Sequence, residues 1–312
     1  MSLRVYAALL VVQVLFGLWP VFGTVVMGHM SPEALIGLRT LVATPLLFLM
    51  FRPGLPPRGP NGRRPWGTLA LLGLLGIAGN QLMYAEGLNR AGPINAALLT
   101  LLIPAQTLLL AWVSGRERPG PARLVGVAVA LFGALTLART DGLAVSDRAL
   151  WGNLALVGNT LSYAAYLVLA RPLAERMGGA AMVTWAFAFG ALEALPMTAP
   201  ALLDAPLGSL SAATWVAVAF IILGATVGTY ALNAYALARA DSSVVAVYIY
   251  VQPVVSASAA WLVLDRLPAG NTLLAGALIA LGVALSIGLV DPARWIRRRG
   301  AIDPPPSGSD SP

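Results

Sequence analysis

Amide and phenol side chains interrupt several long apolar stretches of this chain at helical spacings. Gln81 and Tyr84 lie three residues apart, and Tyr230 and Asn233 repeat this step about 149 residues later. Positions three or four apart share one face of a helix, so each pair can present its hydrogen-bonding groups in one direction. Polar groups within hydrocarbon usually face a protein interior or water. We therefore expect these helix faces to line a water-filled cavity that binds a small solute.

Other side chains of the same chemistry extend this candidate site. Asn95 shares a helix face with Gln106, and Tyr248 shares one with Gln252. Interhelical hydrogen bonds are the alternative for each amide, and simple packing is the alternative for the two tryptophans that lie deep in their stretches. The candidate substrate-binding residues are Trp19, Asn80, Gln81, Tyr84, Asn95, Tyr163, Tyr166, Trp185, Tyr230, Asn233, Tyr248 and Gln252.

Three charged side chains also fall within apolar stretches, namely Arg39, Glu86 and Glu193. A charge in this position is rare and is usually paired, or else it belongs to an ion pathway. We expect Glu86 to pair with Arg39, or these charges to reach toward the membrane surface. Proton coupling through Glu86 or Glu193 is the alternative interpretation.

The stretches that hold these residues are long enough to cross a membrane. Hydrophobic residues make up 58% of the 312 residues and charged residues 11%, against roughly a quarter charged in ordinary globular chains. About 20 apolar residues in a helix span the ~30 Å of hydrocarbon. The expected spans are 5–27, 32–51, 67–88, 92–114, 121–139, 149–170, 179–200, 213–237, 242–263 and 270–289. The fold class is therefore an all-α integral membrane protein with ten transmembrane helices.

Arginine counts predict the orientation of these spans. The chain has no lysine, and with a cytoplasmic N-terminus 15 of its 20 basic residues fall on the cytoplasmic side and 4 on the other. Positive charge accumulates in cytoplasmic loops, so we expect both termini in the cytoplasm. Because most arginines lie in these loops, the net charge of +7 is explained by membrane orientation and contact with anionic lipid headgroups. It does not indicate that the protein binds nucleic acid. There is no cysteine, which excludes disulfides and thiol chemistry.

The two halves of the chain repeat one another. Residues 84–112 and 233–261 align, with Pro104 matching Pro253 and Trp112 matching Trp261. Five spans per copy is an odd number, so the second copy must be inverted, an arrangement that places substrate sites of transporters near the midplane. The paired prolines are candidate hinges, with a static kink as the equal alternative.

This duplication divides the chain into four segments. Residues 1–139 form the first five-helix repeat, 140–148 the connection, 149–289 the second repeat, and 290–312 a basic and then disordered cytoplasmic tail. The fifth and tenth spans contain no Asn, Gln, Tyr or Trp. We expect them at the periphery, where they could form a homodimer interface.

These motifs, in this order, resemble the drug/metabolite transporter superfamily, specifically proteins with two EamA domains such as the YddG-type amino-acid exporters. The likeness covers about residues 5–289 and is strongest in the run YALARADSSVVAVYIYVQPVVSASAAWLVLDRLPAGNTLLAGALIALGV; Pro32, Arg39 and Ala43 fit the second-span pattern. The resemblance implies a ten-helix carrier with inverted repeats in the bacterial inner membrane. It also implies a central cavity lined by spans 1, 3, 4, 6, 8 and 9. Many relatives carry a lysine late in the first span, where this chain reads GTVVMGH.

The chemistry of the expected cavity indicates the class of solute. Rich in Tyr, Trp, Asn and Gln and poor in charge, it suits small neutral or zwitterionic solutes, most of all amino acids. Phosphorylated solutes need several cations, and Arg39 is the only cation within a span. Broad efflux of drugs or toxic metabolites is the alternative. An integral membrane enzyme or a receptor is less favoured, since His29 is the only histidine and H-E-x-x-H, G-x-S-x-G and P-loop motifs are absent. We expect no cofactor and no metal.

Overall fold

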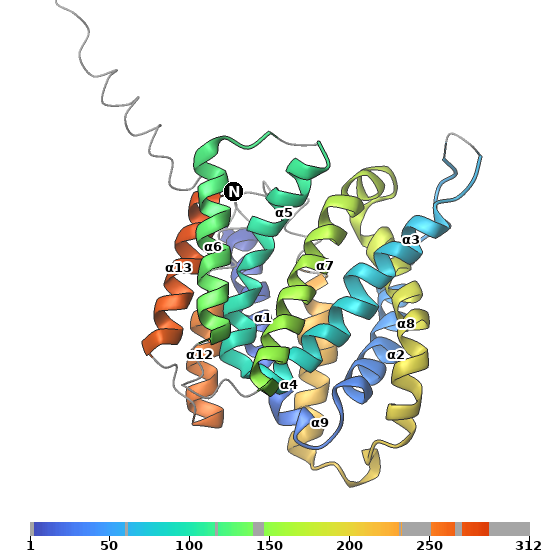
Figure 1. Ribbon diagram of the computed structural model, residues 1–312. Coiled ribbons are helices and arrows are strands. Elements are labelled where there is room, and N and C mark those ends of the chain that lie inside the picture. The colour runs from blue at the N-terminus through green and yellow to red at the C-terminus, as the bar shows by residue number, and fades with distance from the viewer. Residues whose placement is uncertain are drawn as a thin grey trace, which may run out of the picture.

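The chain folds into a bundle of helices that cross one another at varied angles (Figure 1). The computed structural model describes residues 3–59, 62–115, 118–139, 147–230, 232, 251–265 and 270–286, and these residues contain no strand. The helices are α1 (Leu3–Met27), α2 (Pro32–Phe51), α3 (Trp66–Gly73), η1 (Leu74–Ala78), α4 (Gly79–Thr100), α5 (Leu102–Val113), α6 (Pro121–Arg139), α7 (Asp147–Met177), α8 (Gly179–Leu203), η2 (Leu207–Ser209), α9 (Ala212–Ala219), η3 (Phe220–Gly228), α12 (Val251–Leu264) and α13 (Gly270–Ser286).

Several of these helices are long and apolar enough to cross a membrane. Five such stretches occur among the described residues: Ala7–Met27, Pro32–Phe51, Trp66–Thr100, Asp147–Ala170 and Gly179–Leu203. Shorter apolar helices correspond to the other expected spans, and they are Leu102–Val113, Pro121–Gly133, Ala212–Gly228, Val254–Leu264 and Leu273–Gly282. The all-helical class is therefore confirmed, while the count of ten membrane spans stays a prediction.

Local sequence signals explain where the helices begin and end. Ser31 accepts a hydrogen bond from the backbone N–H of Ala34 at 3.2 Å and so caps α2, with Pro32 in the first helical position. Gly92 has φ 84° and ψ 170°, a conformation that side-chain-bearing residues rarely adopt, and Pro93 follows it. Together they interrupt α4 between the expected third and fourth spans.

Two segments of the bundle are π-helical, η1 and η3. The repeat step of about 149 residues carries 74–78 onto 223–227, which lies inside the second of these segments. A π-helical turn holds one residue more than an α-helical turn, and such turns often occur at functional sites. The third and eighth expected spans therefore share an irregularity at the same repeat position.

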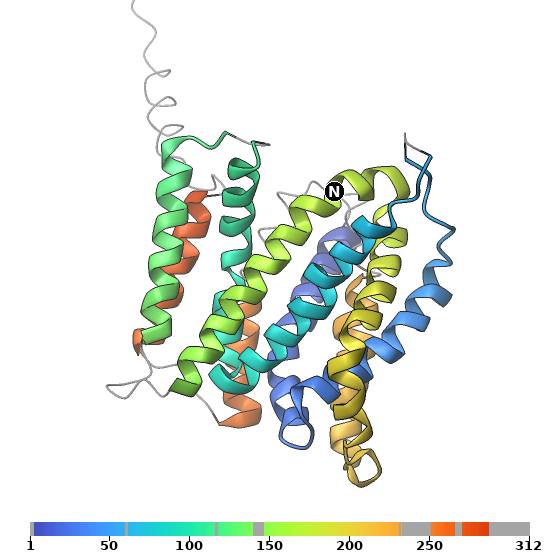
Figure 2. The same ribbon diagram turned by 45° about the vertical axis from the view of Figure 1, so that its right-hand side comes forward.

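Helix packing places the expected fifth and tenth spans together within this chain. In both views α6 and α13 lie side by side (Figures 1 and 2). Glycines allow this approach, because a Cβ at Gly133 would lie 2.8 Å from the backbone nitrogen of Ile279, and one at Gly282 would meet the backbone of Ala130. The other large pairings join α4 with α7, α2 with α8, and α1 with α12. The outer faces of α6 and α13 stay exposed at Phe132, Leu135, Leu273, Leu274 and Leu281.

Candidate functional site

Aromatic side chains from both halves of the chain meet around one arginine inside the bundle. Trp19 comes from α1, Arg39 from α2, Tyr84 from α4, Tyr163 and Tyr166 from α7, and Tyr230 directly follows η3. We call these six residues the aromatic centre. All belong to, or pack against, the same buried apolar cluster, except Arg39, which is itself 5% exposed.

Arg39 is held in the aromatic centre by a ring and a hydroxyl. Its guanidinium carbon lies 5.1 Å from the centroid of the Trp19 ring, within the range of a cation–π contact. The Trp19 ring in turn stacks on Tyr84, with 5.8 Å between the centroids. On the other side, Arg39 Nε donates a hydrogen bond of 2.6 Å to Thr226 Oγ1. These contacts fix the plane of the guanidinium between the first and second halves of the chain.

The remaining tyrosines continue the aromatic centre toward α7 and α8. Tyr163 and Tyr166 stack with centroids 5.4 Å apart, and Tyr230 meets Phe187 edge to face at 5.1 Å. Tyr230 also interacts electrostatically with both Arg39 and Tyr163. The buried cluster therefore combines three ring pairs with phenol groups and one positive charge.

Three of the candidate amides bind other helices instead. Asn80 Nδ2 donates to the carbonyl of Asn159 at 3.0 Å, and Asn159 Nδ2 donates to the carbonyl of Asn80 at 2.8 Å. Asn95 Nδ2 donates to Asn153 Oδ1 at 3.3 Å. Gln252 Nε2 likewise donates to Gln13 Oε1. In each case the structure places the amide in an interhelical hydrogen bond, which was the alternative interpretation, and a substrate role for these residues remains a prediction.

Two further candidates differ in their surroundings. Gln81 is 5% exposed, and its Oε1 atom is buried without a hydrogen-bond partner. Trp185 points toward the connection between α2 and α3, where its Nε1 donates to the carbonyl of Gly54 at 3.0 Å. Its ring packs edge-on against Phe48 and Trp66 rather than joining the aromatic centre. Asn233 and Tyr248 lie outside the described residues.

The expected pairing of Arg39 with Glu86 is wrong. Glu86 forms its salt bridge with Arg90, one turn further along α4. The two side chains stand on the same helix face at a spacing of four, so they meet without bridging between helices. Both are partly exposed, whereas Arg39 is buried. Glu193 has one carboxylate oxygen, Oε2, that is buried without a hydrogen-bond partner.

Of the two candidate hinge prolines, Pro104 lies at the start of a helix rather than in mid-helix. Pro104 is the third residue of α5, and Leu101 separates that helix from α4. Proline has no N–H to bond the carbonyl four residues earlier, which accounts for the break at this point. Pro253 lies in α12, and the residues before Val251 lie outside the described range. A hinge role for either proline remains a prediction.

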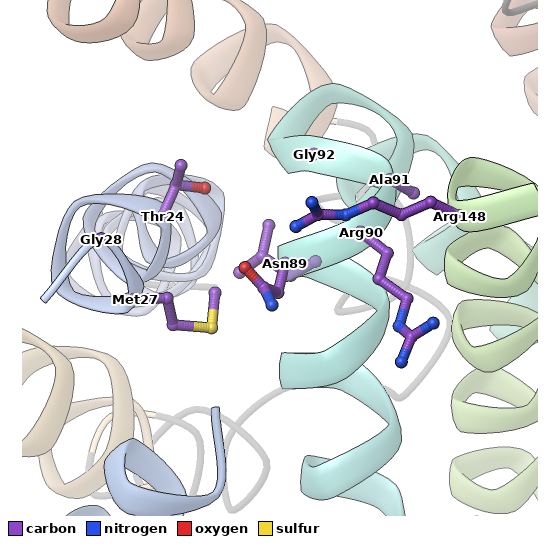
Figure 3. Close-up of a pocket in the computed structure, with 9 residues that line it drawn as sticks. Thr24, Met27, Gly28, Asn89, Arg90, Ala91, Gly92 and Arg148 are labelled. Atoms are coloured by element: carbon purple, nitrogen blue, oxygen red, sulfur yellow. The ribbon is translucent and has the colours of Figure 1, made fainter. Parts of the chain in front are cut away.

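A pocket of about 420 Å³ opens where α1, α4 and α7 meet, on the side that we expect to face the exterior (Figure 3). Figure 3 shows Arg148 extending from α7 toward α1, and Asn89 and Thr24 on facing walls. Close packing separates this pocket from the aromatic centre, because a Cβ at Gly23 would lie 2.8 Å from the Trp19 ring and 3.0 Å from Leu88. Its lining consists of Thr24, Met27, Gly28, Leu88, Asn89, Arg90, Ala91, Gly92 and Arg148.

Thr226 is the contact of Arg39 that the sequence reasoning missed. It lies four residues before Tyr230 but inside the π-helical segment η3, so α-helical spacing is not a reliable signal for it. The described residues contain no group of three or more His, Asp or Glu side chains that could hold a metal ion. The site therefore offers rings, hydroxyls and one guanidinium.

Comparison with known proteins finds similarity to transporters. Residues 3–139 and 150–288 each match the EamA-like transporter family. An uncharacterized transporter of Archaeoglobus fulgidus is 26% identical over 262 residues, which are 83% of this chain and 88% of that protein. A protein of Streptantibioticus cattleyicolor described as a probable terminal-alkyne amino-acid exporter is 30% identical over 232 residues, covering 73% and 76% of the two chains. A crystal structure with 24% identity covers 92% of this chain and 97% of its own at a TM-score of 0.62.

Proposed function

The chain belongs to the EamA-like transporter family, and we propose that it exports small neutral or zwitterionic metabolites, above all amino acids with apolar side chains. The observation that carries this proposal is the aromatic centre, in which rings from α1, α4 and α7 surround polar groups. Rings bind apolar side chains by dispersion and area burial. The phenol groups of the tyrosines bind the polar end of the solute.

Two further observations support amino acids over the broader alternatives. The S. cattleyicolor relative carries an amino-acid exporter description at 30% identity. The positive charge of Arg39 lies within the aromatic centre, and it would repel the cationic drugs that aromatic cages otherwise attract. Phosphorylated solutes would require more than one cation at the centre.

We place the protein in the inner membrane, with both termini in the cytoplasm. Two inverted five-helix repeats would then rock about the aromatic centre and expose it alternately to each side. The pairings of α6 with α13 and of α2 with α8 each join one expected span to its counterpart in the other half, which is compatible with a twofold relation between the halves. The pocket beside Arg148 lies on the expected release path.

Solute flux in proteoliposomes tests this proposal. Purified protein is reconstituted, the vesicles are loaded with a panel of neutral amino acids, and efflux is compared with that from protein-free vesicles. We expect saturable efflux of amino acids with aliphatic or aromatic side chains. Movement of phosphorylated or nucleotide-linked solutes alone would refute the proposal, and movement of hydrophobic cations alone would favour the drug-efflux alternative.

A further inference from the structure

Arg39 leaves the most polar edge of its side chain without a protein partner. Its Nε atom bonds to Thr226 Oγ1 at 2.6 Å, and its face lies over the Trp19 ring. Neither terminal nitrogen, Nη1 or Nη2, forms a hydrogen bond or an ion pair with any residue that the structure describes. The phenols of Tyr84 and Tyr230 interact electrostatically with Arg39, and neither residue supplies a carboxylate.

A buried positive charge of this kind is expensive for a membrane protein to keep. Arginine at the centre of a span is costly on insertion scales, and such residues are usually paired or functional. The expected partner, Glu86, is occupied by Arg90. The two free nitrogens form a planar fork whose geometry matches the two oxygens of a carboxylate. None of the described residues supplies a counter-charge to Arg39, and a ligand can bring one.

We propose that the Nη1–Nη2 fork of Arg39 binds the carboxylate of the transported solute and is the specificity-determining contact of the aromatic centre. The inference rests on the proposed function and names the part of the solute that is recognised. With the carboxylate on Arg39, the apolar side chain of the solute lies among the rings of Trp19, Tyr84 and Tyr230.

The same geometry assigns a lesser role to the amino group. No carboxylate from the described residues joins the aromatic centre, so an ammonium group meets only rings and hydroxyls there. The substrate class is accordingly wider than amino acids: it comprises monocarboxylates with one apolar side chain, in which a hydroxyl can replace the amine. A site built for zwitterions with a matched acid would reject such hydroxy acids.

A ligand series on the unaltered protein tests this inference directly. The probes are L-phenylalanine, 3-phenyllactate, L-phenylalaninamide and phenethylamine, together with the corresponding four compounds built on leucine. The readout is the ligand concentration that half-protects the purified protein against thermal unfolding. We expect the amino acids and the hydroxy acids to bind within about tenfold of each other, and the amides and amines to bind roughly 100-fold more weakly, as when one partner of a buried charge pair is removed.

Three variants test which residue distinguishes the acids from the amides. In Arg39→Gln, acid and amide should bind equally weakly, because the fork is gone. Arg39→Lys keeps the charge without the fork and should restore part of the preference for the acid. Arg123→Gln is the matched control, since that arginine is exposed at the start of α6, and it should keep the full roughly 100-fold preference. Size-exclusion profiles check that each variant is folded, and the ligand series stands even if Arg39→Gln is not.

Each outcome decides the inference separately from the proposed function. Amides that bind as well as acids, or a series in which none of the eight compounds protects, would overturn the carboxylate role of Arg39. Amino-acid efflux from proteoliposomes would then still uphold the proposed function. Acid-selective binding that persists in Arg39→Gln would also overturn the inference, because the selectivity would belong to another residue.

Discussion

The two asparagine pairs between α4 and α7 should respond differently to double substitution, although both pairs join the same helices. In the first pair, each side-chain amide donates to the main-chain carbonyl of the other residue, Asn80 to Asn159 at 3.0 Å and the reverse at 2.8 Å. In the second pair, Asn95 Nδ2 donates to the side-chain oxygen of Asn153 at 3.3 Å. The contrast separates side-chain-to-backbone bonds from side-chain-to-side-chain bonds.

The magnitudes follow from what each alanine removes. Asn80→Ala deletes one amide but leaves its own carbonyl to accept from Asn159, so the two substitutions delete different bonds. Each should lower the free energy of unfolding by about 0.6–1.7 kcal/mol, the range of interhelical bonds in membranes. The double variant should equal the sum of the singles within about 0.5 kcal/mol. Asn95→Ala and Asn153→Ala delete the same bond, so their coupling should be about 0.6 kcal/mol or more.

Reversible unfolding in mixed detergent micelles supplies the four free energies for each cycle. Asn89→Ala serves as the control for helix propensity, because that side chain is exposed on the same helix, and it should change stability by less than about 0.5 kcal/mol. Strong coupling between Asn80 and Asn159, equal to or above that between Asn95 and Asn153, would refute the reasoning, since it would mean that the two amides bond each other rather than the backbone.

Two further predictions concern the α6–α13 contact and the intramembrane acids. Gly282→Ala should destabilise the protein by about 1–3 kcal/mol or more, because the added Cβ meets the Ala130 backbone. Gly270 faces open space, so Gly270→Ala should instead stabilise the protein by about 0.4–1 kcal/mol in the same unfolding assay. Glu86→Gln and Glu193→Gln should each retain amino-acid efflux, because Glu86 is held in an exposed pair of little energetic weight. Substrate accumulation driven by a pH gradient and lost in either variant would contradict this.

The helices could be predicted from the sequence because hydrophobic length is a nearly local property. A run of about 20 apolar residues must cross hydrocarbon as a helix, since no other structure satisfies its backbone. The boundary between the third and fourth expected spans could also be predicted, because Gly92 and Pro93 interrupt the helical backbone conformation at that point. The local sequence pattern does not show which helices pack against each other. The close approach of α6 to α13 is seen only in the packed structure.

The sequence predicted some residues of the aromatic centre, but it did not predict which residues Arg39 contacts there. Trp19, Tyr84 and Tyr230 were chosen for their helix faces, and the structure brings their rings around Arg39. The prediction that Arg39 pairs with Glu86 is wrong, because it rests on opposite charge alone and takes no account of the distance between helices. Its true contacts depend on the rotation of the eighth expected span, which sets where Thr226 points.

That rotation has a physical origin in the π-helical segment. One additional residue in a turn of 3.6 residues rotates everything beyond it by about 100°. Spacing arguments therefore hold within the part of the span that follows the segment, where Tyr230 lies, but not across it to Val216, which is 66% exposed. Thr226 marks the change directly, because its hydroxyl bonds the carbonyl of Ile221, five residues earlier, at 2.9 Å. The same hydroxyl accepts from Arg39, so the irregular turn and the orientation of the guanidinium are joined through one atom. Straightening the turn would take Thr226 away from Arg39, which makes the π-helical segment a requirement of the site and not a defect in the helix.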